Sequence, residues 1–403
     1  MPQVTLAEIQ EAAELLRPVI RYTPMESSRP LAAQVGGPVY LKCENLQRTG
    51  SFKIRGAYTR ISRLTEQERA HGVVAASAGN HAQGVAYAAS LLGIPARVYM
   101  PVGASIAKLT ATRAYGADVH LVGETLDESL VAARAYAADT GAVLVHPFDH
   151  PDVLRGQGTV GLEILEQVPD VATVVVGLGG GGLLSGVAAA LRALRPEVRI
   201  VGVQAEQAAA WPGSLAAGKP VRLYDMSTLA DGIAVGEPTA LTFEHVSALV
   251  DDVVTVTEDQ MARAMLLLLE RAKLVVEPAG VASVAAVASY PERFAAPVVA
   301  VLSGGNIDPL LLLHMTEHGL VAAGRFLSLR VEISDRPGSL ARLLALVGEL
   351  GASVVDLRQS RLGSGLELGD VEVDLRLETR GDSHRDELVT RIAEAGHRII
   401  DRT

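Results

Sequence analysis

Between about Val39 and Ile307, short apolar runs alternate with longer alanine-rich stretches. Nearly continuous apolar runs are typical of strands that are buried on both faces of a parallel sheet. The runs that fit this description cover residues 38–44, 72–77, 96–101, 117–123, 142–148, 172–178, 199–206 and 296–304. The stretches 81–93 and 183–196 between them predict helices, and Pro196 ends the second. The pattern therefore predicts an α/β fold with largely parallel sheet.

After residue 325 the pattern changes to strict alternation of apolar and polar residues, as in "RFLSLRVEI". Alternation indicates strands with one buried and one exposed face. A turn at 334–339, a helix at 340–351, two strands around 363–370, a helix at 385–396 and a last strand at 397–400 follow. The order βαββαβ predicts a separate ferredoxin-like domain.

Composition and charge narrow the functional classes. The 403 residues are 49% hydrophobic and 20% charged, and the net charge is −10, with no basic cluster. Nucleic acid is therefore not expected as a partner. Charges interrupt every apolar stretch before it could span a bilayer, and the start lacks a secretory pattern, so no membrane segment or leader is expected. Cys43 is the single cysteine, which fits a reducing, cytoplasmic setting and a small buried side chain.

Lysine is rare in this chain: only five of its 36 basic residues are lysines. One of them, Lys53, lies in "TGSFKIRGA". Unlike arginine, a desolvated lysine can lose its proton and attack a carbonyl, which suits Schiff-base chemistry. The alternative is a solvated surface lysine, which is the usual location of this residue type.

A glycine-rich loop lies between a predicted strand and a predicted helix, in "VVVGLGGGGLLSGV". Gly179, Gly180, Gly181 and Gly182 would direct backbone N–H groups at an anion, and this favours a phosphate site. Gly177, Gly179 and Gly182 also satisfy G-x-G-x-x-G, with Glu206 where a ribose-binding acid would stand, so spacing leaves a dinucleotide open. A tight turn without a ligand is the third alternative. A nucleoside triphosphate is disfavoured because no Lys-Ser/Thr pair follows the glycines.

A Schiff-base lysine and a phosphate cradle together call for a cofactor with an aldehyde and one phosphate, and pyridoxal phosphate meets both demands. The motifs "LKCENLQRTGSFKIRGA", "ASAGNHAQGVA", "GLGGGGL", "TLADGIAV" and "LSGGN" occur in the order seen in fold-type II pyridoxal-phosphate enzymes. The chain resembles the threonine dehydratases (threonine ammonia-lyases) that carry one C-terminal ACT domain. The resemblance implies two parallel-sheet α/β subdomains followed by the βαββαβ domain.

The resemblance also implies roles for individual residues. Lys53 would form the Schiff base and remove the Cα proton, Phe52 would pack on the cofactor ring, and Ser303 would meet the pyridine nitrogen. The glycine loop with Leu183 would hold the phosphate, and Asn80 would bind the 3'-oxygen. The substrate carboxylate would bind the loop formed by Ser77, Ala78, Gly79, Asn80 and His81. Gly232 and Glu277 lie in further matching motifs. The reaction implied is β-elimination of water from L-threonine, giving 2-oxobutanoate and ammonia, and from L-serine, giving pyruvate.

Two departures separate the chain from the serine racemases of the same fold. Those enzymes carry a serine acid/base where this chain has Ala78, so dehydration is expected rather than racemisation. They also bind a divalent cation through carboxylates where this chain has Gln204 and Ala210, so no metal is expected. The remaining alternatives are a β-replacing synthase, a nicotinamide-dependent oxidoreductase and a non-catalytic amino-acid sensor.

The expected division is a catalytic domain at 1–318, with a smaller subdomain at roughly 50–147, a linker at 319–325 and an ACT domain at 326–403. ACT domains usually pair and bind small amino acids near the first turn, so a homo-oligomer, dimer or tetramer, is expected. That turn holds Asp335, Arg336, Pro337, Gly338 and Ser339, the expected effector site for isoleucine or valine.

Overall fold

The computed structural model describes residues 4–361 and 366–402 and divides into two compact units, 1–312 and 313–403. The division falls inside helix α14 (Pro309–Ala322), which occupies part of the segment expected to be a linker. The loop expected around residues 363–370 lies partly outside the described residues. Within the described ranges, no helix combines the length and apolarity needed to cross a membrane.

The larger sheet of the first unit has six strands in the order β1-β2-β10-β7-β8-β9. These strands are β1 (Met25–Ser27), β2 (Val39–Lys42), β10 (Val298–Val301), β7 (Thr173–Gly177), β8 (Arg199–Ala205) and β9 (Asp252–Val256). β1 is antiparallel to β2, and the other neighbouring pairs are parallel. The sequence pattern missed β1, which has three residues, and β9, an edge strand whose apolar run is broken by Thr255.

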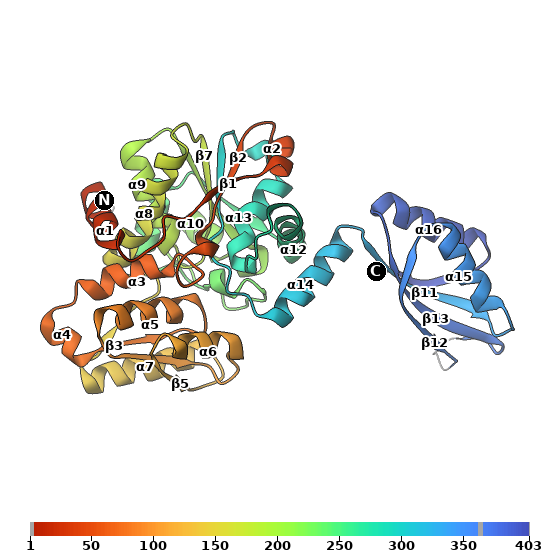
Figure 1. Ribbon diagram of the computed structural model, residues 1–403, viewed down its shortest axis with the longest axis horizontal. Helices are drawn as coiled ribbons and strands as arrows, with labels where there is room; N and C mark the ends of the chain where they lie inside the picture. Colours follow the sequence, from red (N-terminus) through yellow and green to blue (C-terminus); the bar gives the residue numbers. More distant parts are fainter. Residues whose placement is uncertain (1–3, 362–365, 403) are drawn as a thin grey trace. The chain divides into compact units, whose positions relative to one another are not determined.

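A second, smaller sheet is formed by residues between β2 and β7. Its parallel strands follow the order β5 (Asp118–Leu121), β4 (Ala96–Met100), β3 (Val73–Ala76) and β6 (Val143–Leu144). Val73 and Ala75 pack toward helix α5 (Asn80–Leu92), whereas Val74 and Ala76 pack toward helix α7 (Leu126–Thr140). The predicted α/β architecture with two largely parallel sheets is confirmed (Figure 1).

Helices cover both faces of the larger sheet, α8 and α9 on one side and α12 and α13 on the other (Figure 1). The helices of this unit whose bounds are not given above are α1 (Leu6–Leu16), α2 (Arg29–Val35), α3 (Lys53–Ser62), α4 (Glu66–His71), α6 (Ile106–Ala114), α8 (Pro151–Gln167), α9 (Gly182–Leu194), α10 (Ala210–Ala217), α11 (Ala240–Leu249), α12 (Glu258–Leu267) and α13 (Pro278–Ser289). Of these, α1 packs on α8, α11 packs on α9, and α6 contacts the smaller sheet. α8 and α9 approach closely because glycines face each other: a Cβ at Gly186 would lie 2.3 Å from the Leu154 carbonyl oxygen.

The second unit has the predicted βαββαβ order. It contains β11 (Phe326–Ser334), α15 (Ser339–Glu349), β12 (Ser353–Ser360), β13 (Asp370–Glu378), α16 (Asp382–Glu394) and β14 (Arg398–Arg402). The antiparallel sheet has the order β12-β13-β11-β14, which is the ferredoxin-like arrangement. Alternate residues of β11 and β13 are buried against α15 and α16, as the alternating pattern predicts.

Candidate active site

Lys53 is the first residue of α3, and its side chain reaches a cavity in the first unit. Nζ donates a hydrogen bond to the carbonyl oxygen of Pro147 at 3.0 Å and lies 5.1 Å from the centre of the Phe52 ring. Loss of hydration lowers the pKa of Lys53 to about 8, while the charge of Glu277 acts in the opposite direction. The amine therefore exchanges its proton readily near neutral pH, as nucleophilic and basic roles require.

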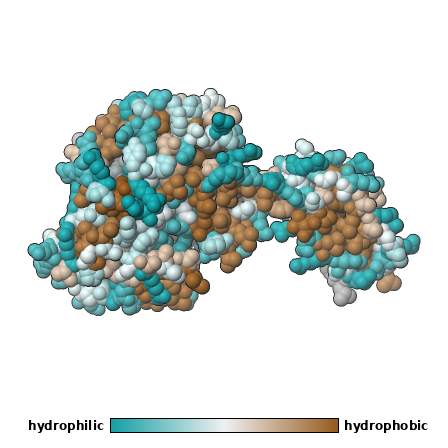
Figure 2. All heavy atoms as spheres, in the orientation of Figure 1, coloured by the Kyte–Doolittle hydropathy of each residue, from teal (hydrophilic) through white to brown (hydrophobic). Residues whose placement is uncertain are grey.

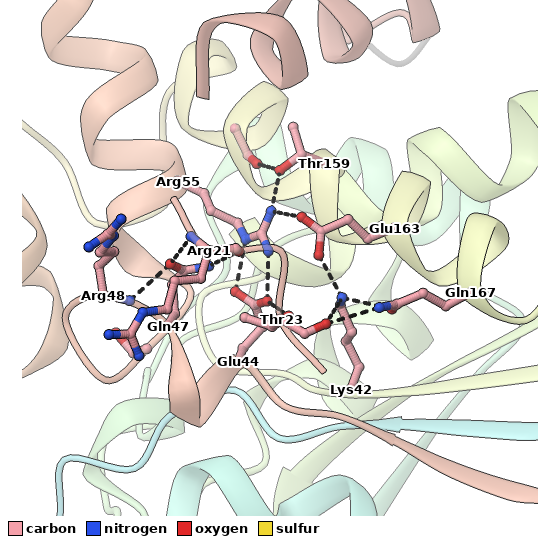
Figure 3. A network of polar contacts seen from close by, with 12 residues as sticks. Arg21, Thr23, Lys42, Glu44, Gln47, Arg48, Arg55, Thr159, Glu163 and Gln167 are labelled. Atoms are coloured by element: carbon pink, nitrogen blue, oxygen red, sulfur yellow. Dashed lines mark hydrogen bonds and ion pairs between the residues drawn. The ribbon is translucent and has the colours of Figure 1, made fainter. Parts of the chain in front are cut away.

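A buried network of ion pairs stabilises the start of α3 (Figure 3). Arg55 stands two residues after Lys53, so its side chain leaves the opposite side of the helix. Its guanidinium donates to both oxygens of Glu44, at 2.7 and 2.8 Å, and to Glu163 at 2.6 Å. Lys42 completes the network with a 2.5 Å ion pair to Glu163. Two cations and two carboxylates balance one another where solvent is excluded, which fixes the start of α3 and hence the base of the Lys53 side chain.

The glycine loop joins the carboxyl end of β7 to the N-terminus of α9. Gly181 has φ +93°, which an L side chain rarely adopts. A Cβ at Gly180 would lie 2.3 Å from the Phe148 ring. Trp211 Nε1 donates to the Gly179 carbonyl oxygen at 2.7 Å and fixes the loop from below. The glycines are therefore required by close packing, and they leave the free N–H groups of α9 facing the cavity.

The loop 77–81 follows the carboxyl end of β3 and begins α5. Gly79 caps the helix, and its N–H donates to Ser77 Oγ at 3.2 Å. Nε2 of the His81 ring lies 2.7 Å from the carbonyl oxygen of Val145, and burial lowers the pKa of His81 to about 3. This neutral ring is engaged with the backbone, so the loop offers an anion the backbone of His81 rather than its imidazole.

Asn80 links this loop to Glu277, 197 residues away in sequence, through a 2.5 Å hydrogen bond from Nδ2 to Oε1. Its Oδ1 accepts a 2.8 Å hydrogen bond from Asn306. Glu277 is 4% exposed, and burial together with the charge of Asp231 raises its pKa to about 7. Sequence reasoning gave Glu277 only a motif match, because its pairing with Asn80 depends on the tertiary structure.

One cavity of about 320 Å³ brings the predicted catalytic-domain site residues together. Its lining includes Phe52, Lys53, Ser77, Ala78, Gly79, Asn80, His81, Gly179, Gly180, Gly181, Gly182, Leu183 and Ser303. Sequence reasoning missed Lys108, Pro147, Phe148 and Asp231, which also line it. Pro147 and Phe148 follow the carboxyl end of β6, where ligands of parallel sheets usually bind, so topology could have found them. Asp231 begins a three-residue helix and does not follow the end of a strand, so topology gave no such signal, and only its place in the motif "TLADGIAV" pointed to it.

Several residues singled out in the sequence lie elsewhere. Glu206, the expected ribose acid of a dinucleotide site, is exposed and does not line the cavity. Gln204 is buried, and its Oε1 accepts a 2.9 Å hydrogen bond from the backbone N–H of Trp211. Its side chain therefore stabilises the start of α10. Asp335 to Gly338 form the turn between β11 and α15 in the second unit, and Ser339 is the first residue of α15.

The lining fits pyridoxal phosphate. The phosphate matches a cradle from which side chains are excluded, and the aldehyde matches a lysine with a lowered pKa. Ser303, 6% exposed, offers a neutral hydroxyl in the same cavity. The volume lies within the range of pockets for small molecules.

Comparison with known proteins agrees with this geometry. The profile of the family described as "Pyridoxal-phosphate dependent enzyme" matches residues 16–304. The chain is similar to the L-threonine ammonia-lyase of Thermotoga maritima, with 47% identity over 98% of this chain and 99% of that protein. Among solved structures, threonine deaminase isoform 2 from Solanum lycopersicum has 36% identity and a TM-score of 0.75, covering 79% of this chain and 95% of that one. Maize serine racemase has 36% identity and a TM-score of 0.74, covering 79% and 98%. The chain therefore belongs to the family of pyridoxal-phosphate dependent enzymes.

Proposed function

We propose that the protein deaminates L-threonine to 2-oxobutanoate and ammonia, and L-serine to pyruvate and ammonia, by elimination of water. The observation that carries the proposal is the shared cavity, in which a lysine with a pKa of about 8 faces both a glycine cradle and an anion-binding helix start. The similarity to an L-threonine ammonia-lyase from Thermotoga maritima and a threonine deaminase from Solanum lycopersicum supports the same substrate.

The cavity residues divide the work of holding the cofactor and the substrate. Lys53 would hold pyridoxal phosphate covalently, residues 179–183 would bind its phosphate, and Phe52 and Ser303 would contact its ring. Asn80 would bind its 3'-oxygen while Glu277 and Asn306 fix the Asn80 amide. The start of α5 would bind the substrate carboxylate, because its free N–H groups and dipole favour an anion.

When bound, pyridoxal phosphate supplies an electron sink that makes the substrate Cα–H bond acidic. Lys53, released from its covalent link, takes the Cα proton as a general base, and its lowered pKa suits this transfer near neutral pH. The β-hydroxyl departs with that proton as water and leaves an unsaturated amine, and hydrolysis of this amine by one water molecule gives the oxoacid and ammonia.

Ala78 supports elimination over racemisation. Racemisation needs a proton donor on each face of Cα, and a methyl side chain at position 78 supplies none. Maize serine racemase shares the fold of this chain, so the distinction depends on such single positions and not on the architecture.

Release of oxoacid and ammonia from L-threonine and L-serine tests the proposal. Replacement of Lys53 by Ala should lower the rate by about a thousandfold or more, because it removes the base. Replacement of the exposed Lys219 by Ala is the matched control and should leave the rate unchanged. Turnover of the Lys53→Ala variant near the wild-type rate, or racemisation of L-serine that rivals elimination, would contradict the proposal.

We further propose that the second unit is an ACT domain that binds a small amino acid, isoleucine or valine, at residues 335–339. Gly338 has φ +85° and immediately precedes α15, so the backbone is open to a ligand at a helix start. ACT domains usually pair, which supports a homo-oligomer, and the single cysteine supports a reducing, cytoplasmic setting. Figure 2 shows apolar residues on the visible face of this unit, and Val354, Val355 and Ile400 are among its exposed apolar side chains.

A further inference from the structure

A second hollow of about 260 Å³ adjoins the reaction cavity. It is lined in part by Gly103, Ser105, Asn306 and Asp308, which are all partly or fully exposed. The glycine loop and Ser303 in the reaction cavity are buried. The second hollow thus lies nearer the solvent than the buried end of the reaction cavity at the glycine loop and Ser303, and we call it the vestibule.

Four residues line both hollows: Ala78, Lys108, Asp231 and Glu277. Lys108 belongs to α6, beside the smaller sheet, and Asp231 begins the short helix η3 (Asp231–Ile233), which packs on α13 beside the larger sheet. Lys108 Nζ donates to Asp231 Oδ2 at 2.7 Å. The ion pair therefore lies at the boundary between the vestibule and the cavity and joins the two sheet systems.

This ion pair can open at little cost. The Asp231 side chain is 63% exposed and that of Lys108 is 15% exposed, so water reaches the carboxylate of the pair and weakens its attraction to the ammonium. The contact between Ser105 Oγ and Asp308 Oδ2, at 2.6 Å, is a single hydrogen bond between two residues that line only the vestibule.

The charges of the pair match those of an α-amino acid. A Cβ at Gly79 would lie 3.9 Å from Lys108 Nζ, so the ammonium stands beside the loop proposed to bind the carboxylate. Asp231 offers a carboxylate to the substrate ammonium. The carboxylate of a zwitterion can thus take the place of Asp231 beside Lys108, and its ammonium can take the place of Lys108 beside Asp231.

We propose that Lys108 and Asp231 form a charge-selective gate between the vestibule and the reaction cavity that admits zwitterionic α-amino acids. The inference rests on the proposed function, whose substrates are such zwitterions. The gate acts on entry and precedes the chemistry at Lys53.

Stopped-flow absorbance of the bound cofactor on mixing with L-threonine tests the gate, because it reports substrate arrival without requiring turnover. Lys108→Met and Asp231→Asn should each slow the absorbance change by about fivefold or more, and the salt dependence of its rate should weaken. KM should rise more than kcat falls. Asp127→Asn is the matched control, since Asp127 pairs with Arg222 at 3.7 Å without lining either hollow, and its rate should equal that of the wild type.

The double variant with Lys108→Asp and Asp231→Lys keeps an ion pair but reverses the charges that meet the substrate. It should remain as slow as the single variants. Wild-type rates of the absorbance change in either single variant, or recovery of the wild-type rate in the reversed pair, would overturn the gate. The ion pair would then have only a structural role.

The proposed deamination and the proposed gate can be contradicted independently of each other. An absorbance change that is slowed in the gate variants, without oxobutanoate from the wild type, would contradict threonine deamination and support the gate. Oxobutanoate formation with unaltered rates in the variants would support the deamination and overturn the gate. Absence of any absorbance change with L-threonine or L-serine would overturn both.

Discussion

At the residue scale, Glu277 shows how burial sets a charge. Its pKa is raised from 4.5 to about 7, chiefly by burial. A carboxyl whose pKa is higher in the folded state contributes stability that is fully present below its unfolded value and is lost as the pH rises through about 7. Glu277→Gln keeps the acceptor for Asn80 and removes the titration. The unfolding free energy of the variant minus that of the wild type should therefore rise by about 2–3 kcal/mol when the pH is raised from 5 to 8.

Urea unfolding of the wild type and the variant, without cofactor, at both pH values measures this difference. An equal difference at the two pH values would show that Glu277 is ionised throughout this range in the folded protein. The exchange should not disturb the fold, because the hydrogen bond from Asn80 Nδ2 needs only an oxygen.

At the element scale, the turn between β7 and α9 depends on the absence of side chains. Gly180→Ala would place a methyl 2.3 Å from the Phe148 ring and displace it into the cavity. Overpacking of this kind costs about 1–3 kcal/mol. Because the ring and the loop line the cofactor cavity, we expect at least about a tenfold loss of affinity for pyridoxal phosphate, measured by absorbance titration of the apoprotein.

A matched glycine exchange exists at Gly213 in α10, where a Cβ would meet nothing within 4 Å. Gly213→Ala should leave the affinity unchanged and stabilise the helix slightly. Adding Phe148→Leu to Gly180→Ala should restore part of the affinity. Unaltered binding by Gly180→Ala alone would show that the loop can shift away from the ring.

At the scale of the whole molecule, the two units are expected to be separable in activity and regulation. Maize serine racemase is matched over 98% of its length by 79% of this chain, so a catalytic unit of this kind occurs without the C-terminal one. A chain that ends at Gly324, after α14, should keep cofactor and threonine turnover but lose any response to isoleucine or valine. An effector acts only through a difference in affinity between states, typically about 1–3 kcal/mol.

Calorimetry of the full-length protein with isoleucine and valine, beside steady-state kinetics of both chains, measures this coupling. The Gly338→Val variant of the full chain is the companion test, since a branched side chain at φ +85° would obstruct the turn. An unchanged effector response after truncation would refute the regulatory role and leave the second unit as an assembly module.

The sequence by itself determined the features that local chemistry encodes. Continuous apolar runs predicted the buried parallel strands, alternation predicted the one-sided sheet of the second unit, and the glycines beside a strand predicted the anion cradle. The rarity of lysine drew attention to Lys53, and the motif order placed the cofactor. These features depend on neighbours within a few residues, so periodicity and spacing reveal them.

The tertiary structure alone decided which distant groups meet. The Pro147 carbonyl that receives Lys53 is 94 residues away, and Lys108 and Asp231 are 123 residues apart. The His81 ring and the Val145 carbonyl that it contacts are 64 residues apart. No local pattern fixes such pairs, because they arise where the carboxyl ends of strands from two sheets converge, and the burial that results there sets the pKa values of Lys53 and Glu277.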